Sequence, residues 1–261
     1  MNDREYEIMF RREDSYWWYR GMRAVTRAFA PGIFTRAAGA RALDAGCGTG
    51  RNLVDLAAGG PAVGVDLSLR ALGFARRRGA APLVCAAVEA LPFPAASFQA
   101  ALSRDVLYMV PDDARAAREI ARVLAPGGTL ALSAPAFDAL AGAHDVAVGA
   151  LRRYTAQGLK RLLEEEGFVV RRTSYSNFFL ALPIWFLRKV TGAKARGRPR
   201  EEVRSDFGLA PIPFEEIFFF LLSLEARILA LRGRLPLGVS VLVLAEKPRQ
   251  GVGAGTSEAG K

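Results

Sequence analysis

Histidine and cysteine are scarce in this chain of 261 residues, which has one histidine and two cysteines. The cysteines, Cys47 and Cys85, lie in different parts of the sequence and show no metal-ligand spacing. We therefore expect neither a disulfide framework nor a metal centre. Such sparing use of cysteine is typical of proteins from a reducing compartment.

The sequence also lacks a long apolar run. No stretch reaches the roughly 18–20 apolar residues that a membrane-spanning helix needs. Residues 1–12 are charged and have no apolar core, so we expect no secretory leader there. These absences predict a cytoplasmic protein. Features of the C-terminal half, described below, make a location at the inner face of the membrane an alternative.

What the chain does have is an ordinary globular composition, with 51% hydrophobic and 24% charged residues. Its length suffices for one large α/β domain with a sizeable core. The net charge of +10 is uneven, because residues 151–261 hold 19 Lys and Arg against 11 Asp and Glu. This excess favours an anionic partner or surface near the C-terminal half; an arginine-rich surface without a partner is the alternative.

Residues 41–52 (RALDAGCGTGRN) organise the rest of the sequence. A short apolar run reaches Asp44, and glycines follow at every second position before an apolar-periodic segment begins. This order predicts a buried strand, a tight turn and a helix start whose free N–H groups face a ligand. A dinucleotide fingerprint is excluded, because Arg51 stands where its third glycine would be.

The run D-x-G-x-G-x-G resembles the first motif of the class I S-adenosylmethionine (SAM)-dependent methyltransferases. The resemblance implies an α/β, Rossmann-like fold with a seven-stranded, mostly parallel sheet whose last strand is antiparallel. It also implies that the loop wraps the methionine part of SAM. The cofactor-binding residues implied here are Asp44, Gly46, Cys47, Gly48 and Gly50.

The segments after this loop fit the same family. Strands are expected over 62–68, 83–86, 97–103, 129–134, 168–174 and 239–246, and helices over 69–78 and 112–124. The run Arg76 to Arg78 followed by Gly79 suits the end of a helix, so we interpret it as structural. Residues 122–130 match the family's R-x-L-x-P-G-G-x-L signature, which marks the fold.

Further cofactor contacts are implied at the ends of the next strands. Asp66, followed by Leu67, is placed to accept hydrogen bonds from both ribose hydroxyls. Val88 and Glu89 lie in the loop that resembles the family's adenine loop, although Ala87 replaces its usual acid. Two residues at the end of the fourth strand, Ser103 and Arg104, complete the predicted cofactor site.

An aromatic segment near the N-terminus and a segment around the only histidine are the candidates for the acceptor side. Trp17, Trp18 and Tyr19 lie in a helical lead-in, residues 1–30, that resembles the lid of many small-molecule methyltransferases; plain helix packing is the alternative. The order H-D-…-R-R-Y-T over 144–155 resembles relatives with sugar and lipid-linked substrates. The candidates are His144, Tyr108 and Tyr154 for acid–base chemistry, and Arg152 and Arg153 for binding a carboxylate or phosphate.

About 60 residues separate the sixth and last strands, and this insert (175–237) is peculiar to the chain. It contains an apolar helix over 214–231 and a basic stretch from Arg188 to Arg204. A helix that is apolar nearly all round needs a cover. Three covers are open: an anionic membrane surface contacted through 178–231, a second subunit of a homodimer, and the acceptor pocket.

The methyltransferase domain should span 31–247, followed by a disordered tail over 248–261. The expected function is methyl transfer from SAM to a small-molecule or lipid- or sugar-linked acceptor, with S-adenosylhomocysteine as product. A SAM-binding or partner-binding module without catalysis is the alternative. Nucleic acid ranks lower as a substrate, because Ser103–Val106 lacks the N/D-P-P-Y/F motif of base-amino methyltransferases.

Overall fold

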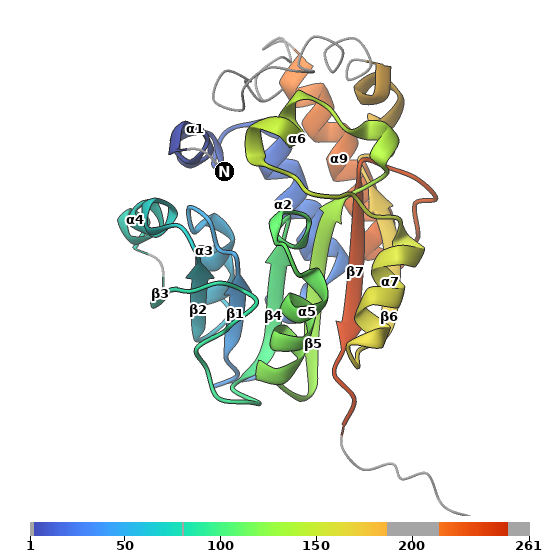
Figure 1. Ribbon diagram of the computed structural model, residues 1–261. Coiled ribbons are helices and arrows are strands. Elements are labelled where there is room, and N and C mark those ends of the chain that lie inside the picture. Colours follow the sequence, from blue (N-terminus) through green and yellow to red (C-terminus); the bar gives the residue numbers. More distant parts are fainter. Residues whose placement is uncertain (1–2, 80, 187–213, 250–261) are drawn as a thin grey trace, which may run out of the picture.

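The computed structural model of the protein describes residues 3–79, 81–186 and 214–249. Its centre is a seven-stranded sheet in the order β3-β2-β1-β4-β5-β7-β6 (Figure 1). The strands are β1 (Ala42–Ala45), β2 (Ala62–Asp66), β3 (Leu83–Cys85), β4 (Phe98–Arg104), β5 (Leu124–Pro135), β6 (Val169–Ser176) and β7 (Ser240–Glu246). The neighbours from β3 to β5 pair in parallel, and β7 runs antiparallel to both β5 and β6. The predicted fold class is confirmed.

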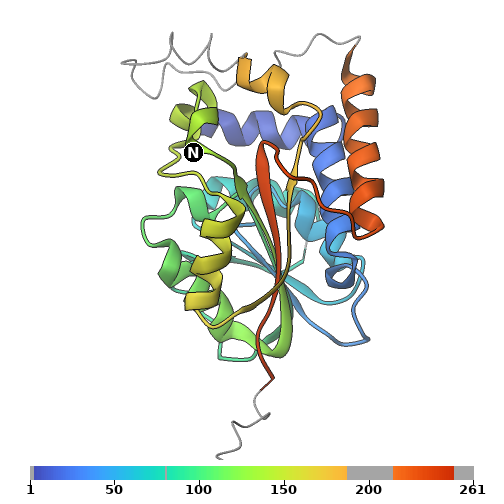
Figure 2. The ribbon, with the colours of Figure 1, turned by 90° about the vertical axis from the view of Figure 1, so that its right-hand side faces the viewer.

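Helices cover both faces of this sheet. They are α3 (Arg51–Ala57), α4 (Leu69–Arg77), α5 (Asp113–Val123), α6 (Ala143–Val148) and α7 (Ala156–Glu165), with short 3-10 helices at Pro31–Ile33, Leu107–Met109 and Asp138–Leu140. The Thr155 side chain caps α7 by accepting from the Gly158 amide. Buried side chains of α5 and α7 fill one face of the sheet. The other face is filled from α3 and from the helices at the two ends of the chain (Figure 2).

Two N-terminal helices, α1 (Asp3–Arg12) and α2 (Trp17–Phe29), realise the predicted helical lead-in. Helix α1 passes above the edge of the sheet where the parallel strands end (Figures 1 and 2). Helix α2 lies beside the insert helix α9 (Glu215–Ala230), and Leu222 is fully buried between them. The two helices approach closely, because a Cβ added at Gly21 would lie 2.2 Å from Leu222 Cδ1.

This packing adds a partner that was not among the predicted covers of the insert helix. Helix α2 covers the buried face of α9, which includes Ala226 and Leu229, and Phe218 lines the cavity described below. Nothing in the sequence indicates the pairing of α2 with α9, since periodicity describes a face and not its partner. A contact of α9 with a membrane or a second subunit stays a prediction. Phe214, Ile217 and Phe220 remain exposed on α9.

A buried carboxylate joins α9 to the start of the insert. Glu225 is fully buried and accepts hydrogen bonds from the amides of Asn177 (2.7 Å) and Phe179 (3.3 Å). Residues 181–186 continue from this turn as a helix. The predicted basic stretch, and the predicted tail from residue 250 onward, lie outside the described residues. No helix within the described ranges is long and apolar enough to cross a membrane.

The contact between α2 and α9 can be tested by truncating Leu222. Leu222→Ala should lower the free energy of unfolding by roughly 2–5 kcal/mol, because it leaves a cavity between two packed helices. Phe220→Ala is the matched control on the exposed side of α9, with an expected change within about 0.5 kcal/mol. Denaturant unfolding of both variants measures the difference, and equal effects would contradict the described packing.

Candidate functional site

A cavity of about 600 Å³ opens where the parallel strands end. Its floor is formed by the loops after β1, β2, β3 and β4, and its upper wall comes from α1, α2, α9 and residues 180–184. In open parallel sheets ligands bind at this edge, beside the point where the strand order reverses. Here the order reverses at β1, between β2 and β4.

The glycine loop forms one end of this cavity, but its members have different roles. Gly46, Cys47 and Gly48 line the cavity, and Gly48 has a φ of +54°. A side chain at Gly48 would be strained and would narrow the cavity. Gly50 does not line the cavity, and a Cβ there would lie 2.7 Å from the Cβ of Ala75. We predicted a cofactor contact at Gly50, but this glycine instead permits close packing of the loop against α4.

Asp66 stabilises the glycine loop from the neighbouring strand. Its carboxylate accepts hydrogen bonds from the Gly48 amide (2.8 Å) and from the Ser68 amide (2.9 Å). Burial raises the pKa of Asp66, and these two hydrogen bonds oppose that shift. Asp66 and Leu67 both line the cavity. The acid is therefore at the position from which the sequence predicts contact with ribose.

The predicted adenine loop and the end of β4 supply further lining residues at the same end of the cavity as the glycine loop. Val88 and Glu89 line the cavity, and so does Ala87. At the end of β4 the structure separates the predicted pair. Arg104 lines the cavity, whereas Ser103 is buried below it.

The guanidinium of Arg104 is a cation held in the cavity wall. Its side chain is 10% exposed, and its Nη1 donates to Asn52 Oδ1 at 3.1 Å. Its Nε is buried without a hydrogen-bond partner. Asp44 also has a buried oxygen, Oδ2, without a partner, but it does not line the cavity. The predicted direct contact of Asp44 with a ligand is thus corrected to a place beneath the loop.

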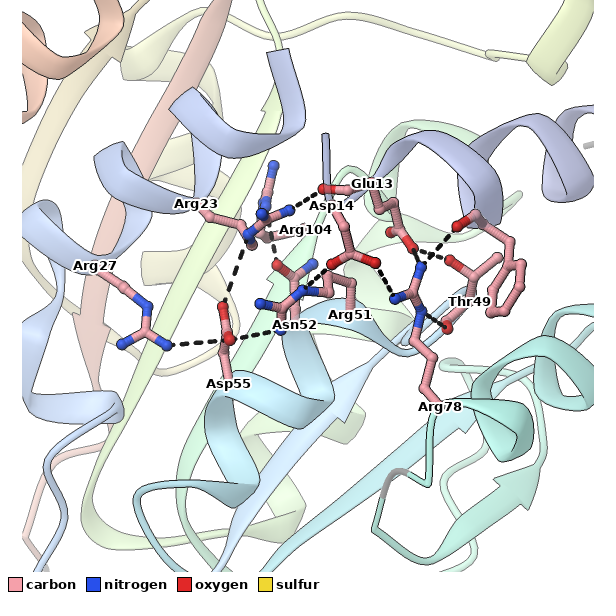
Figure 3. Close-up of polar contacts among 11 residues, drawn as sticks. Glu13, Asp14, Arg23, Arg27, Thr49, Arg51, Asn52, Asp55, Arg78 and Arg104 are labelled. Atoms are coloured by element: carbon pink, nitrogen blue, oxygen red, sulfur yellow. Dashed lines mark hydrogen bonds and ion pairs between the residues drawn. The ribbon is translucent and has the colours of Figure 1, made fainter. Parts of the chain in front are cut away.

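A network of charged side chains fastens the N-terminal helices above the glycine loop (Figure 3). Arg78 forms ion pairs with Glu13 (3.0 Å) and Asp14 (2.7 Å). It also donates to the carbonyl oxygens of Phe10 (2.9 Å) and Thr49 (3.0 Å). The Thr49 hydroxyl donates to Glu13, which is buried and lines the cavity.

The sequence patterns did not predict this network. The run of arginines at 76–78 was interpreted as the end of a helix, and nothing in the sequence paired Arg78 with Glu13. Burial raises the pKa of Glu13, while Thr49 and Arg78 oppose that shift. A second ion pair, between Arg51 and Asp14 at 2.6 Å, supports the same contact from α3. The cofactor end of the cavity is therefore roofed by the N-terminal segment.

At the other end of the cavity lie several of the residues predicted for the acceptor. Trp17 and Trp18 line the cavity from α2, Tyr108 from the 3-10 helix after β4, and His144 from α6. Tyr19 also lines the cavity from α2, but it interacts electrostatically with Glu13 and Arg104 of the cofactor end. The rings of Trp17 and Phe218 lie 5.0 Å apart, so the aromatic segment and the insert helix form one wall.

Arg153 also lines this end, but its guanidinium is already engaged. It forms two hydrogen bonds of 2.8 Å with the carboxylate of Asp145 and donates to the Ala136 carbonyl oxygen. This arrangement fixes α6, the short helix that carries His144, beside the cavity. Arg153 thus has a positioning contact in addition to the predicted place beside the acceptor.

Two predicted residues turn away from the cavity. The Tyr154 hydroxyl donates to Asp113 Oδ2 (2.6 Å), and Arg152 forms an ion pair with Asp113 Oδ1 (3.0 Å). Neither residue lines the cavity. The predicted catalytic role of Tyr154 and the predicted substrate contact of Arg152 are corrected to structural contacts with the start of α5.

Residues 43–132 match a family model described as a methyltransferase domain. The match covers 90 of the 261 residues. An uncharacterized protein of Mycobacterium tuberculosis is 40% identical over 137 residues, which is 49% of this chain and 46% of that protein. An O-methyltransferase of Aspergillus sclerotiorum is 33% identical over 152 residues, covering 51% and 56% of the two chains. The chain spans about half the length of the curated relatives it matches.

Solved structures show the same fold. Geranyl diphosphate C-methyltransferase from Streptomyces coelicolor A3(2) aligns with a TM-score of 0.59, covering 87% of this chain and 79% of its own. The two sequences are 16% identical. At this identity the likeness concerns the fold alone, and it agrees with the sheet order and with the antiparallel last strand described above.

The contact between α1 and the glycine loop can be tested at Arg78. Arg78→Ala leaves Glu13 buried without its charge partner, so α1 should open more often. Amide hydrogen exchange in residues 5–12 should become faster by about ten-fold or more. Arg76→Ala, an exposed arginine on the same helix, is the matched control and should leave exchange unchanged. Equal exchange in the two variants would remove Arg78 from this role.

The buried carboxyl of Asp44 leads to a prediction about how the stability of the fold depends on pH. Burial raises its pKa from 3.8 to about 7, Arg104 opposes this shift, and Asp66 and Glu13 add to it. The folded state therefore holds a proton that the unfolded state releases, so this group stabilises the fold at low pH. That contribution declines as pH rises from about 4 through about 7, by about 1.4 kcal/mol for each unit of pKa shift.

Asp44→Asn should remove this dependence. Thermal unfolding of ligand-free protein between pH 4 and 8 is the measurement. The stability of the variant relative to the unchanged protein should rise across that window and level off above about pH 7. A difference that stays constant with pH would contradict the assignment.

Proposed function

We propose that this protein transfers a methyl group from SAM to a small-molecule or a lipid- or sugar-linked acceptor, leaving S-adenosylhomocysteine. The observation that carries the proposal is that one cavity joins two different ends. Gly48 and Asp66 lie at the first end, and Trp18, His144 and Phe218 lie at the second. A methyl donor and its acceptor need this kind of shared, largely enclosed space.

The residues present fit SAM in this cavity. The carboxylate of Asp66 suits the two ribose hydroxyls, and the backbone around Val88 and Glu89 suits the adenine. The unpartnered Nε of Arg104 suits the methionine carboxylate, because a buried guanidinium N–H without an acceptor is costly. Gly48 keeps the loop open for the methionine chain.

When bound, SAM would supply a methyl group on a positively charged sulfur, which would leave as a neutral thioether as the acceptor bonds to the methyl group. The protein's part is to align the acceptor and exclude water, which α1 and α2 do from above the cavity. Where the acceptor holds a proton, His144 and Tyr108 are the side chains proposed to take it, since both line the acceptor end.

Cofactor binding can be tested at Asp66. Asp66→Ala removes a charged hydrogen-bond acceptor from the cavity, so the dissociation constant for SAM should rise by about ten-fold or more. Asp138→Ala, at an exposed acid away from the cavity, is the control and should leave it unchanged. Calorimetric titration with SAM measures both, after thermal unfolding has shown that each variant is folded. Unchanged binding by Asp66→Ala would refute the placement of ribose.

Methyl transfer itself calls for a second experiment. The purified protein and SAM with a labelled methyl group are added to a cell lysate that contains membranes. Label should appear in a new product with the unchanged protein and disappear with Asp66→Ala. Binding of SAM without transfer of label to any fraction would favour the alternative function, a binding module without catalysis.

A further inference from the structure

The acceptor end of the cavity has an apolar wall made by three separate segments. Trp18 comes from α2, Leu180, Pro183 and Ile184 come from residues 180–184, and Phe218 comes from α9. None of these side chains carries a charge. By contrast, the cofactor end is lined by Glu13, Asp66 and Arg104. The acceptor end therefore favours an apolar group, whereas the cofactor end favours a polar or charged one.

From this wall we propose that the acceptor is an amphiphile whose apolar chain lies between α2, α9 and residues 180–184. The inference rests on the proposed function, because it assigns the acceptor of that same cavity. Its polar group would face His144 and Tyr108, which line the cavity near the loop after β4. Apolar walls with a few polar groups at one end are the usual design of sites for such molecules.

The wall is fixed in place by contacts that do not depend on a ligand. Glu225 is buried, and its carboxylate binds the amides of the turn that precedes residues 180–184. Phe218 is held by ring contact with Trp17. A buried carboxylate is costly to maintain unless hydrogen bonds compensate it. Here its two hydrogen bonds hold the two halves of the wall together.

The same segments are apolar on their outer sides as well. Leu182 and Phe186 are 76% and 68% exposed, and on α9 Ile217 and Phe220 are 52% and 62% exposed. Single exposed apolar residues are common, but these four side chains, called the outer patch below, lie on the two segments that also line the cavity. A chain too long for the cavity would meet apolar surface outside it. The amphiphile can therefore come from solution or from a bilayer.

Binding of a fluorescent fatty acid, 11-(dansylamino)undecanoic acid, tests the inner wall. The unchanged protein should bind it saturably, and Phe218→Gln should weaken this binding by about ten-fold or more. Phe220→Gln, on the exposed side of the same helix, is the matched control and should change it less than about two-fold. Ile184→Gln provides a second inner-wall variant if Phe218→Gln does not fold. Absence of saturable binding, or equal binding by the inner and outer variants, would overturn the proposal.

Two further arms distinguish the source of the amphiphile. Sedimentation with phosphatidylglycerol vesicles that is lost in Phe220→Gln, together with probe binding, supports uptake from a bilayer. Probe binding without sedimentation supports uptake from solution. A dimer that dissociates in Phe220→Gln, with no probe binding by the monomer, would overturn the proposal and assign the outer patch to a second copy.

SAM titration in parallel separates this inference from the proposed function. If SAM binds and the fatty acid does not, only the acceptor inference fails. If the fatty acid binds between these walls and SAM does not bind, the proposed function fails, while the apolar site itself remains.

Discussion

The guanidinium of Arg78 is the contact on which the cofactor end of the cavity depends. It lies at the end of α4 and bonds at once to three parts of the N-terminal segment and to the glycine loop. This cation pairs with the buried carboxylate of Glu13, which also accepts a hydrogen bond from Thr49. Together with the ion pair between Arg51 and Asp14, it holds the N-terminal segment as the roof of the cavity (Figure 3).

The acceptor end is built by a different principle. Its helices are held by apolar packing, with Leu222 fully buried against α2 and a single buried acid, Glu225, tying the insert together. Ion pairs with several partners keep the cofactor end of the cavity closed, whereas close packing of apolar side chains keeps the acceptor end closed.

Local patterns predicted much of the fold. The order of the strands and the antiparallel last strand follow from short-range signals and from the family resemblance, although β5 begins at Leu124, five residues before the predicted start at 129. At the site, the loop around Gly48 and the acid at Asp66 were predictable because both stand at the ends of parallel strands. Tyr154 was misplaced, since a motif gives sequence order but not the direction of a side chain. The contacts of Arg78 and α9 join residues far apart in the chain, and no periodicity encodes them.

The pairing of α2 with α9 has a consequence for how the chain reaches this structure. The ion pair between Arg20 and Glu216, which links these helices, spans 196 residues of sequence. During synthesis α2 emerges early, and its partner emerges only after six of the seven strands. The aromatic face of α2 must therefore remain uncovered through most of translation. Late closure of so long a loop is a slow step and leaves an apolar surface open to aggregation, so chaperones should matter more for this protein than its stability alone would suggest.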